Sequence, residues 1–314
     1  MTTSATWSVS GTGSKIQIES GGNLVATSAI TVAAATTFQI DNGGTYTHSN
    51  TSAFGSTIMA GTESFGNSST VIFTDWNSTG PSVSSWGNVK FNATGTVAGS
   101  IQFSGALTTI NGNLEILATG TGTVREVRLA TTGSYTMTIG GDLIVSGGII
   151  DLASGATGGT RTISIGGNFN MSGGTFKQTN TTATSLSFTG TGKTYTQSAG
   201  TFTNTNMDWN VNSGASVTMA NNWSIATSKT LTVAGTLDCS TLAVTGAGAF
   251  TLSTNGTLKL GNTAGLSSTA STGAIQVTGT RTYNATGVTI EYNGSSAQNT
   301  GNQFPASLKN FTVS

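Results

Sequence analysis

The residue types that could support hydrolysis are the carboxylates, and they are spread thinly along the sequence. Asp142 and Asp151 flank one repeat, and Asp208 and Asp238 lie about one repeat apart. Polysaccharide lyases and hydrolases need several carboxylates close together, for proton transfer or for a metal. Neither pair comes with a third acid. We therefore predict that the chain is not an enzyme and that these four aspartates lie apart, at corners or on the surface, bonded to local backbone.

Residues that bind metals or act as nucleophiles are equally scarce. The chain has one histidine, His48, and one cysteine, Cys239. We expect His48 to be a hydrogen-bonding group in a polar surface corner, and Cys239 to be a small buried residue of a strand. The glycine-rich strings 120–123 and 190–193 lack the following helix that a phosphate loop requires. The sequence predicts no metal site and no cofactor.

Glu126 and Arg128 alternate along one short strand-like run. Alternating residues share a face of a strand, so we expect the two side chains to form a surface ion pair. Such a pair contributes about 0–1 kcal/mol to stability.

Trp76 and Trp86 are the residues that the sequence predicts as carbohydrate contacts. Both lie in an irregular segment, with Asp75, Asn77 and Asn88 nearby. Flat aromatic rings beside amides and carboxylates can stack on sugar rings, because the ring is apolar and its neighbours are polar. The alternative is that both indoles cover an apolar flank of the fold.

The elements that must position these residues are short strands. Apolar and polar residues alternate in runs such as 16–18 and 258–260, which is the strand period. Hydrophobic residues make up 35% of the chain and charged residues only 7%, and strong helix formers are scarce. A chain with apolar residues placed so regularly can bury a core, so we predict a folded all-β protein rather than a disordered one.

Internal repeats identify the architecture. The segment 141–150 returns as 167–176, and the end of that unit returns as 200–206. A drifting period of about 20–30 residues indicates a solenoid, whose units bury their apolar sides by stacking. Glycine, asparagine and aspartate separate the runs and tolerate the positive φ of sharp corners. Because the Leu- and Ala-rich segments of helical repeats are missing, we predict a parallel β-helix of roughly 13 unequal coils.

We predict a single continuous β-solenoid over residues 1–314. Within it, 74–88 breaks the rhythm and is expected to form a loop or excursion, since Pro81 cannot donate to a strand ladder. Asp142 occupies the position that Asn113 and Asn168 fill in neighbouring units, which predicts a corner. Residues in equivalent strand positions should point into the core: Leu143, Val145, Phe169, Met171 and Leu237.

The distribution of charged and apolar residues argues against two classes of partner, nucleic acids and membranes. The formal net charge is zero, with eleven acidic and eleven basic residues scattered singly. Nucleic-acid binding needs clustered Lys and Arg, so no nucleic-acid partner is predicted. No apolar run approaches the ~20 residues of a spanning helix, so no membrane insertion is predicted. The N-terminus lacks the pattern of a signal peptide.

Several segments together resemble the β-strand-repeat, adhesin-like surface proteins of Bacteroidetes-type bacteria. They are 111–114, 121–128, 139–148, 279–283, 292–298 and 304–313. The resemblance implies an extracellular or cell-surface protein exported by the type IX route. It also implies a segment of a longer chain that ends in a sorting domain, and it brings no catalytic residues.

We therefore expect an extracellular structural or adhesive segment of a larger surface or fibre-forming protein. Its expected partners are neighbouring copies or further repeats of the same chain, and extracellular glycans. The first alternative is a carbohydrate-binding β-helix module. The second, less favoured, is a polysaccharide lyase or hydrolase. Ice binding is disfavoured, because unequal coils would not hold threonine rows in register.

Overall fold

The computed structural model describes residues 1–52, 61–76, 80, 83–97, 99–122, 125–130, 133–155, 159–179, 183–203, 206–267, 272–284 and 287–314. This part of the chain is all-β without a helix, and its parallel strands stack as a β-solenoid of about 12 turns. The predicted parallel β-helix is confirmed. Two compact units are described separately below. The first comprises Met1–Arg161, Met171–Thr182 and Ala199–Asn204, and the second comprises Thr162–Asn170, Ala183–Ser198 and Thr205–Ser314.

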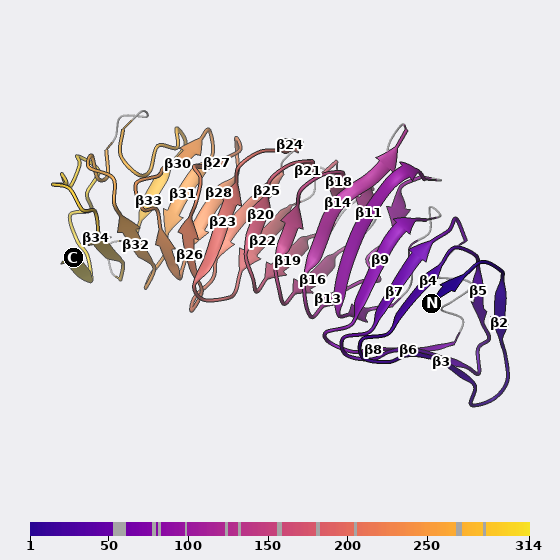
Figure 1. Ribbon diagram of the computed structural model, residues 1–314. Coiled ribbons are helices and arrows are strands. Elements are labelled where there is room, and N and C mark those ends of the chain that lie inside the picture. Colours follow the sequence, from indigo (N-terminus) through magenta and orange to yellow (C-terminus); the bar gives the residue numbers. More distant parts are fainter. Residues whose placement is uncertain are drawn as a thin grey trace. The chain divides into compact units, whose positions relative to one another are not determined.

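The first unit is built from five groups of neighbouring parallel strands. Their orders are β1-β4-β7-β9-β11-β14-β17, β10-β13-β16, β12-β15-β18-β21-β24, β2-β5 and β3-β6-β8. In Figure 1 the long strands β4, β7, β9, β11 and β14 lie side by side. The strands are β1 (Thr2–Thr3), β2 (Trp7–Val9), β3 (Lys15–Ile18), β4 (Asn23–Ala26), β5 (Ile30–Val32), β6 (Thr37–Ile40), β7 (Thr45–Ser49), β8 (Thr62–Phe65), β9 (Thr70–Asp75), β10 (Ser85–Trp86), β11 (Asn88–Thr96), β12 (Ile101–Gln102), β13 (Thr109–Ile110), β14 (Leu114–Thr121), β15 (Val127–Arg128), β16 (Tyr135–Ile139), β17 (Leu143–Val145), β18 (Ile149–Asp151), β21 (Thr175–Lys177) and β24 (Thr201–Thr203).

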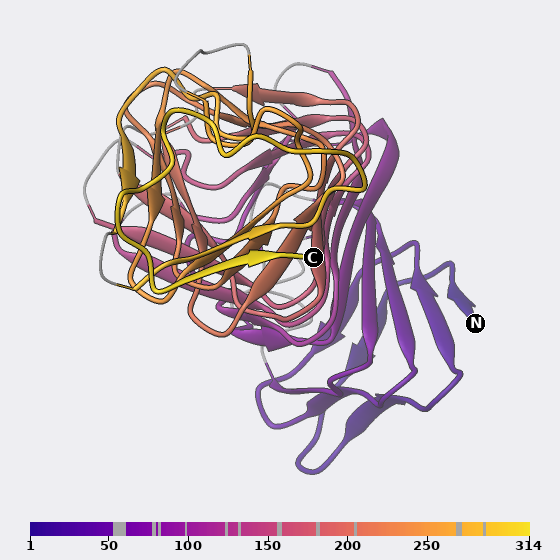
Figure 2. The same ribbon diagram turned by 90° about the vertical axis from the view of Figure 1, so that its left-hand side faces the viewer.

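The second unit repeats the same design with three groups, β23-β26-β29-β32-β34-β35, β22-β25-β28-β31-β33 and β27-β30. Figure 2 shows its orange and yellow coils end-on, as loops stacked behind one another. Its strands are β22 (Thr184–Phe188), β23 (Lys193–Gln197), β25 (Met207–Val211), β26 (Ser216–Met219), β27 (Trp223–Ile225), β28 (Thr230–Val233), β29 (Thr236–Asp238), β30 (Val244–Gly246), β31 (Ala249–Leu252), β32 (Thr257–Leu260), β33 (Arg281–Tyr283), β34 (Thr289–Tyr292) and β35 (Asn310–Val313). The strands β19 (Arg161–Ile165) and β20 (Phe169–Met171) have residues in both units.

The strand register shows how unequal coils share one fold. Each strand pairs in parallel with the strand one coil further on, as Val89 does with Leu114 and Leu237 with Leu258. The step from Thr70 to Asn88 is much shorter than the step from Leu258 to Ile290. Most of the length difference therefore falls in the connections, and register shifts occur within the β7–β9 and β11–β14 pairs. Elsewhere the strands keep their alternation of inward and outward side chains.

The predicted inward positions are buried. Burial follows the alternation because inward side chains are enclosed by the strands, and outward ones face solvent or covering loops. The five residues predicted for the core are each exposed by 1% or less: Leu143, Val145, Phe169, Met171 and Leu237.

Asparagine and aspartate hold the corners, as the repeat pattern predicted. The backbone N–H of Asn113 donates to Asn88 Oδ1 over 2.9 Å, and that of Asp142 donates to Asn113 Oδ1 over 2.8 Å. In the second unit, Thr194 N–H donates to Asn168 Oδ1 over 2.9 Å. These side chains accept amides that lie one coil further on, which satisfies backbone donors where the strands end.

A glycine corner in the first unit explains the most visible sequence repeat. Gly148, Gly174 and Gly200 have φ of 65°, 67° and 83°, a left-handed conformation that favours glycine. Close approach adds a second requirement. A Cβ on Gly174 would lie 2.6 Å from the carbonyl oxygen of Gly148, and one on Gly200 would lie 2.5 Å from that of Gly173.

The excursion predicted for 74–88 falls partly outside the described residues. Strand β9 ends at Asp75 and the short strand β10 covers Ser85–Trp86, whereas 77–79 and 81–82, including Pro81, are not described. Both the excursion and the single continuous solenoid over 1–314 remain predictions.

Candidate functional site

Four charged residues of the first unit lie together in a group, called here the ionic cluster: Glu126, Arg128, Asp151 and Lys177. Three of them stand in register on successive strands, with Arg128 of β15 opposite Asp151 of β18 and Asp151 opposite Lys177 of β21. Glu126 precedes β15 directly. The solenoid thus stacks side chains that are distant in sequence into one row.

Lys177 lies between the two acids. Its Nζ is 2.5 Å from Glu126 Oε2 and 3.9 Å from Asp151 Oδ2. The other carboxylate oxygen of Glu126 accepts a hydrogen bond from Arg128 Nε. Glu126 therefore has one cation on each oxygen, and Lys177 joins three neighbouring strands.

Burial makes this cluster different from an ordinary surface ion pair. Glu126 is 1% exposed and Asp151 is fully buried, whereas the side chains of Arg128 and Lys177 are 26% and 22% exposed. The prediction of a surface pair between Glu126 and Arg128 was therefore wrong. The pair exists, but Lys177, which lies two coils further along the chain, contacts Glu126 and shields it from water.

Asp151 is held by backbone as well as by charge. Its Oδ1 accepts the N–H groups of Ala153 at 3.0 Å and Thr179 at 3.2 Å, and its Oδ2 accepts the Thr179 hydroxyl at 2.5 Å. The predicted bonding to local backbone is confirmed, but the predicted corner or surface position is wrong because Asp151 is buried. A carboxyl with two amides on one oxygen is fixed in orientation and polarised.

Of two other predicted aspartates, Asp238 bonds to local backbone as predicted, whereas Asp208 bonds to the backbone of the next coil. Asp208 Oδ1 accepts the N–H of Thr230, and Asp238 Oδ1 accepts that of Ser240, both over 2.8 Å. Each contact ties a carboxylate to backbone, and neither requires a ligand.

Both tryptophans predicted as carbohydrate contacts are core residues. Trp76 is 1% exposed and donates from Nε1 to the Gly99 carbonyl over 2.7 Å. Trp86 is fully buried and stacks on Phe73, with ring centroids 5.7 Å apart. Because neither ring presents a face to solvent, their placement does not support the carbohydrate prediction.

His48 is also buried, which corrects its predicted place in a polar surface corner. It is 1% exposed in β7, where alternation puts it on the same inward face as Tyr46. Its Nδ1 lies 3.2 Å from the Tyr46 hydroxyl, and its Nε2 lies 3.1 Å from the carbonyl oxygen of Ser52. Burial lowers the pKa of His48 from 6.5 to about 4, although backbone hydrogen bonds to Ser52 and Asn50 oppose that shift.

We expect the protein to lose about 2 kcal/mol of stability between pH 7 and pH 5 through His48. The folded-state pKa lies below the unfolded value, so folding favours the neutral ring. This stabilisation is fully present above pH 6.5 and is lost as the pH falls toward about 4. Urea unfolding at pH 7, 6 and 5 measures it, and His48 is the only histidine.

The control for this prediction is His48→Gln, which removes the titrating ring but keeps a polar side chain. Burial raises the pKa of Glu63, so that residue contributes with the opposite sign in both proteins. Subtracting the two pH profiles isolates His48. Equal slopes in wild type and variant would contradict the prediction.

Cys239 is fully buried in the second unit, as predicted. Burial, with a smaller effect from Asp238, raises the pKa of its thiol well above the ordinary value. Since the thiolate is the reactive form, its burial disfavours reaction of this cysteine in the folded protein.

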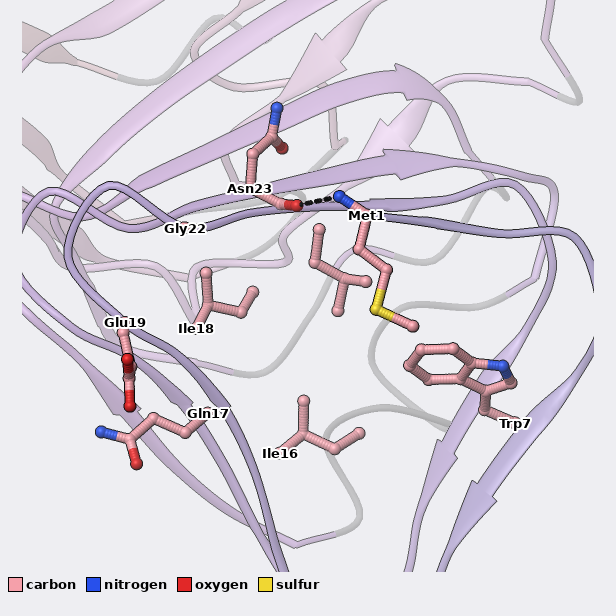
Figure 3. Close-up of a pocket in the computed structure, with 9 residues that line it drawn as sticks. Met1, Trp7, Ile16, Gln17, Ile18, Glu19, Gly22 and Asn23 are labelled. Carbon is pink, nitrogen blue, oxygen red and sulfur yellow. Dashed lines mark hydrogen bonds between the residues drawn. The ribbon is translucent and has the colours of Figure 1, made fainter.

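A cavity of about 310 Å³ lies in the first unit beside β3 and β4 (Figure 3). Its walls include the side chains of Met1, Trp7, Ile16 and Ile18, while Gln17 points away from it. The Met1 ammonium donates to the carbonyl of Asn23 over 2.7 Å. The lining is mainly apolar, so the cavity is poorly suited to acid–base chemistry.

Two further observations limit the chemistry. Among the described residues, no group of three or more His, Cys, Asp or Glu side chains is placed to hold a metal ion. The same part of the chain has no helix long and apolar enough to cross a membrane.

In comparisons with known proteins, no family model, no curated protein and no solved structure matches the chain.

Proposed function

We propose that the chain is a structural and adhesive β-solenoid segment of a larger extracellular surface or fibre-forming protein. The observation that carries the proposal is the use of charged and amide side chains to join coils. Lys90 and Glu115 pair across neighbouring strands at 3.0 Å, as do Lys259 and Glu291. Side chains used in this way add to the interface between neighbouring coils, on which the stability of a repeat protein depends.

Two lines of support come from the sequence. The resemblance to adhesin-like repeat proteins favours a cell-surface location and export by the type IX route. Low charge and outward Thr, Ser and Asn suit contact with extracellular glycans and with neighbouring copies or further repeats. A dedicated carbohydrate-binding module would need a platform other than Trp76 and Trp86, because both are buried.

The test has an enzymatic and an adhesive arm. The purified chain is incubated with a panel of neutral and uronic-acid polysaccharides, and new reducing ends and unsaturated products are measured. We expect no turnover, and we expect saturable binding to glycan-coated or self-coated surfaces in a microbalance. Turnover that Asp151→Asn or Asp238→Asn abolishes would replace the structural proposal with an enzymatic one. If the chain binds neither the glycan-coated nor the self-coated surface, the adhesive role is wrong.

A further inference from the structure

We propose that Lys177 and Asp151 form an intramolecular isopeptide bond, with Glu126 as the catalytic residue that carries the protons. The amide would join β18 to β21 and so link two successive coils covalently. This proposal does not depend on the extracellular or adhesive role, because the bond forms within the folded chain from groups that are already in place.

Register brings the two reacting groups together. Asp151 and Lys177 are direct partners in a parallel ladder, and Lys177 Nζ lies 3.9 Å from Asp151 Oδ2. Groups held this close have effective concentrations far above those of free solutes, which favours a reaction between them. The reaction requires a rotation of the flexible lysine side chain that moves Nζ from Glu126 toward the carboxyl carbon of Asp151.

Glu126 is placed to accept the proton that makes Lys177 nucleophilic. Its Oε2 lies 2.5 Å from Lys177 Nζ, and Arg128 holds its other oxygen. An ammonium ion cannot attack a carboxyl group, but the amine can once a base has taken a proton. With Glu126 1% exposed, water does not compete for that proton.

The surroundings of Asp151 resemble an oxyanion hole. The N–H groups of Ala153 and Thr179 point at Oδ1 from 3.0 and 3.2 Å, where negative charge develops when nitrogen adds to the carboxyl carbon. The Thr179 hydroxyl donates to Oδ2, the oxygen that leaves. The two oxygens of Asp151 are therefore distinguished before the reaction begins.

The step is balanced without any co-reactant. Glu126 takes one proton from the Lys177 ammonium and passes it to Oδ2 of Asp151, which becomes a carboxylic acid. The amine nitrogen then bonds to the carboxyl carbon of Asp151. The tetrahedral intermediate carries a negative charge on Oδ1 and a positive charge on the lysine nitrogen. Oδ2 then departs as water with that proton and a second one from nitrogen, both passed through Glu126, which returns to its carboxylate form. One C–N bond replaces one C–O bond, and nothing is oxidised or reduced.

The other lysine–carboxylate pairs provide a comparison within the chain. The lysines have similar exposure in all three places, but the carboxylates do not: Glu115 and Glu291 are 23% and 20% exposed, whereas Glu126 and Asp151 are 1% and 0% exposed. Water stabilises the ionic forms at such positions, so these pairs are expected to remain salt bridges.

Intact mass spectrometry of the purified, denatured protein tests the proposal. We expect a mass lower than that of the sequence by one water molecule. Trypsin cannot cleave after an acylated lysine, so the peptide 129–161 should appear joined through Asp151 to an uncut 162–193. Fragmentation of this species locates the link.

Matched variants separate chemistry from folding. Lys177→Arg keeps the positive charge but cannot form the amide, and Glu126→Gln keeps the size but removes the proton carrier. Both should show the full sequence mass, while Lys259→Arg should keep the loss of one water. Circular dichroism shows whether each variant is folded. A wild-type protein with the full sequence mass after prolonged incubation, or a mass loss that Lys177→Arg retains, would overturn the proposal.

Discussion

Replacing Trp223 with alanine should lower the free energy of unfolding by about 3–5 kcal/mol. Trp223 is fully buried in the second unit. Its ring stacks on Tyr195 with centroids 4.0 Å apart and meets Trp209 edge-on at 5.2 Å. Removing the indole takes away these contacts and a third one, edge-on with Phe188 at 5.9 Å, and leaves a cavity in a closely packed core.

Urea unfolding followed by near-ultraviolet circular dichroism measures this loss. Trp223→Phe is the matched control, because it keeps a ring in contact with Tyr195, and it should cost about 1–2 kcal/mol. If Trp223→Ala costs no more than Trp223→Phe, the aromatic cluster does not stabilise the second unit as argued.

Gly174→Ala should destabilise the protein by about 3 kcal/mol, which is large for the addition of one methyl group. Two costs combine at this position. The φ of 67° is unfavourable for an L-residue, and the new Cβ would lie 2.6 Å from the Gly148 carbonyl oxygen. Relief of that contact requires two coils to move apart, which weakens the ladder between them.

Gly21→Ala separates the two costs. Gly21 has a similar φ of 75°, but a Cβ there meets nothing within 4 Å. It should therefore cost only about 1 kcal/mol, the penalty of the backbone conformation alone. Thermal unfolding of both variants gives the comparison. Equal losses would mean that coil spacing at the glycine corner adapts freely.

Local pattern was enough to predict the fold. Alternation in runs such as 143–145 predicts which side chains are inward, and the recurring Gly-Gly pairs predict corners with positive φ. Each signal is contained within one coil and depends only on strand and turn geometry. Burial of Leu143 and Val145 and the φ of Gly148 confirm them.

The ionic cluster could not be predicted in the same way. Glu126 and Lys177 meet across two coils of unequal length, and no fixed period aligns them. The burial of His48 could have been predicted, since its spacing from Tyr46 in a strand puts both side chains on one face. The polar neighbours Thr47 and Ser49 pointed to a surface corner instead, but they occupy the outward positions of β7.

The parallel register has a consequence for how the chain folds. Every pairing described above joins a strand to the strand one coil away, so the distance along the sequence between partners does not grow as coils are added. Relative contact order therefore falls with length, unlike that of β-sandwiches or barrels. Once any two adjacent coils have formed, the next coil adds to an existing edge, and the ordered region extends in either direction from wherever it began.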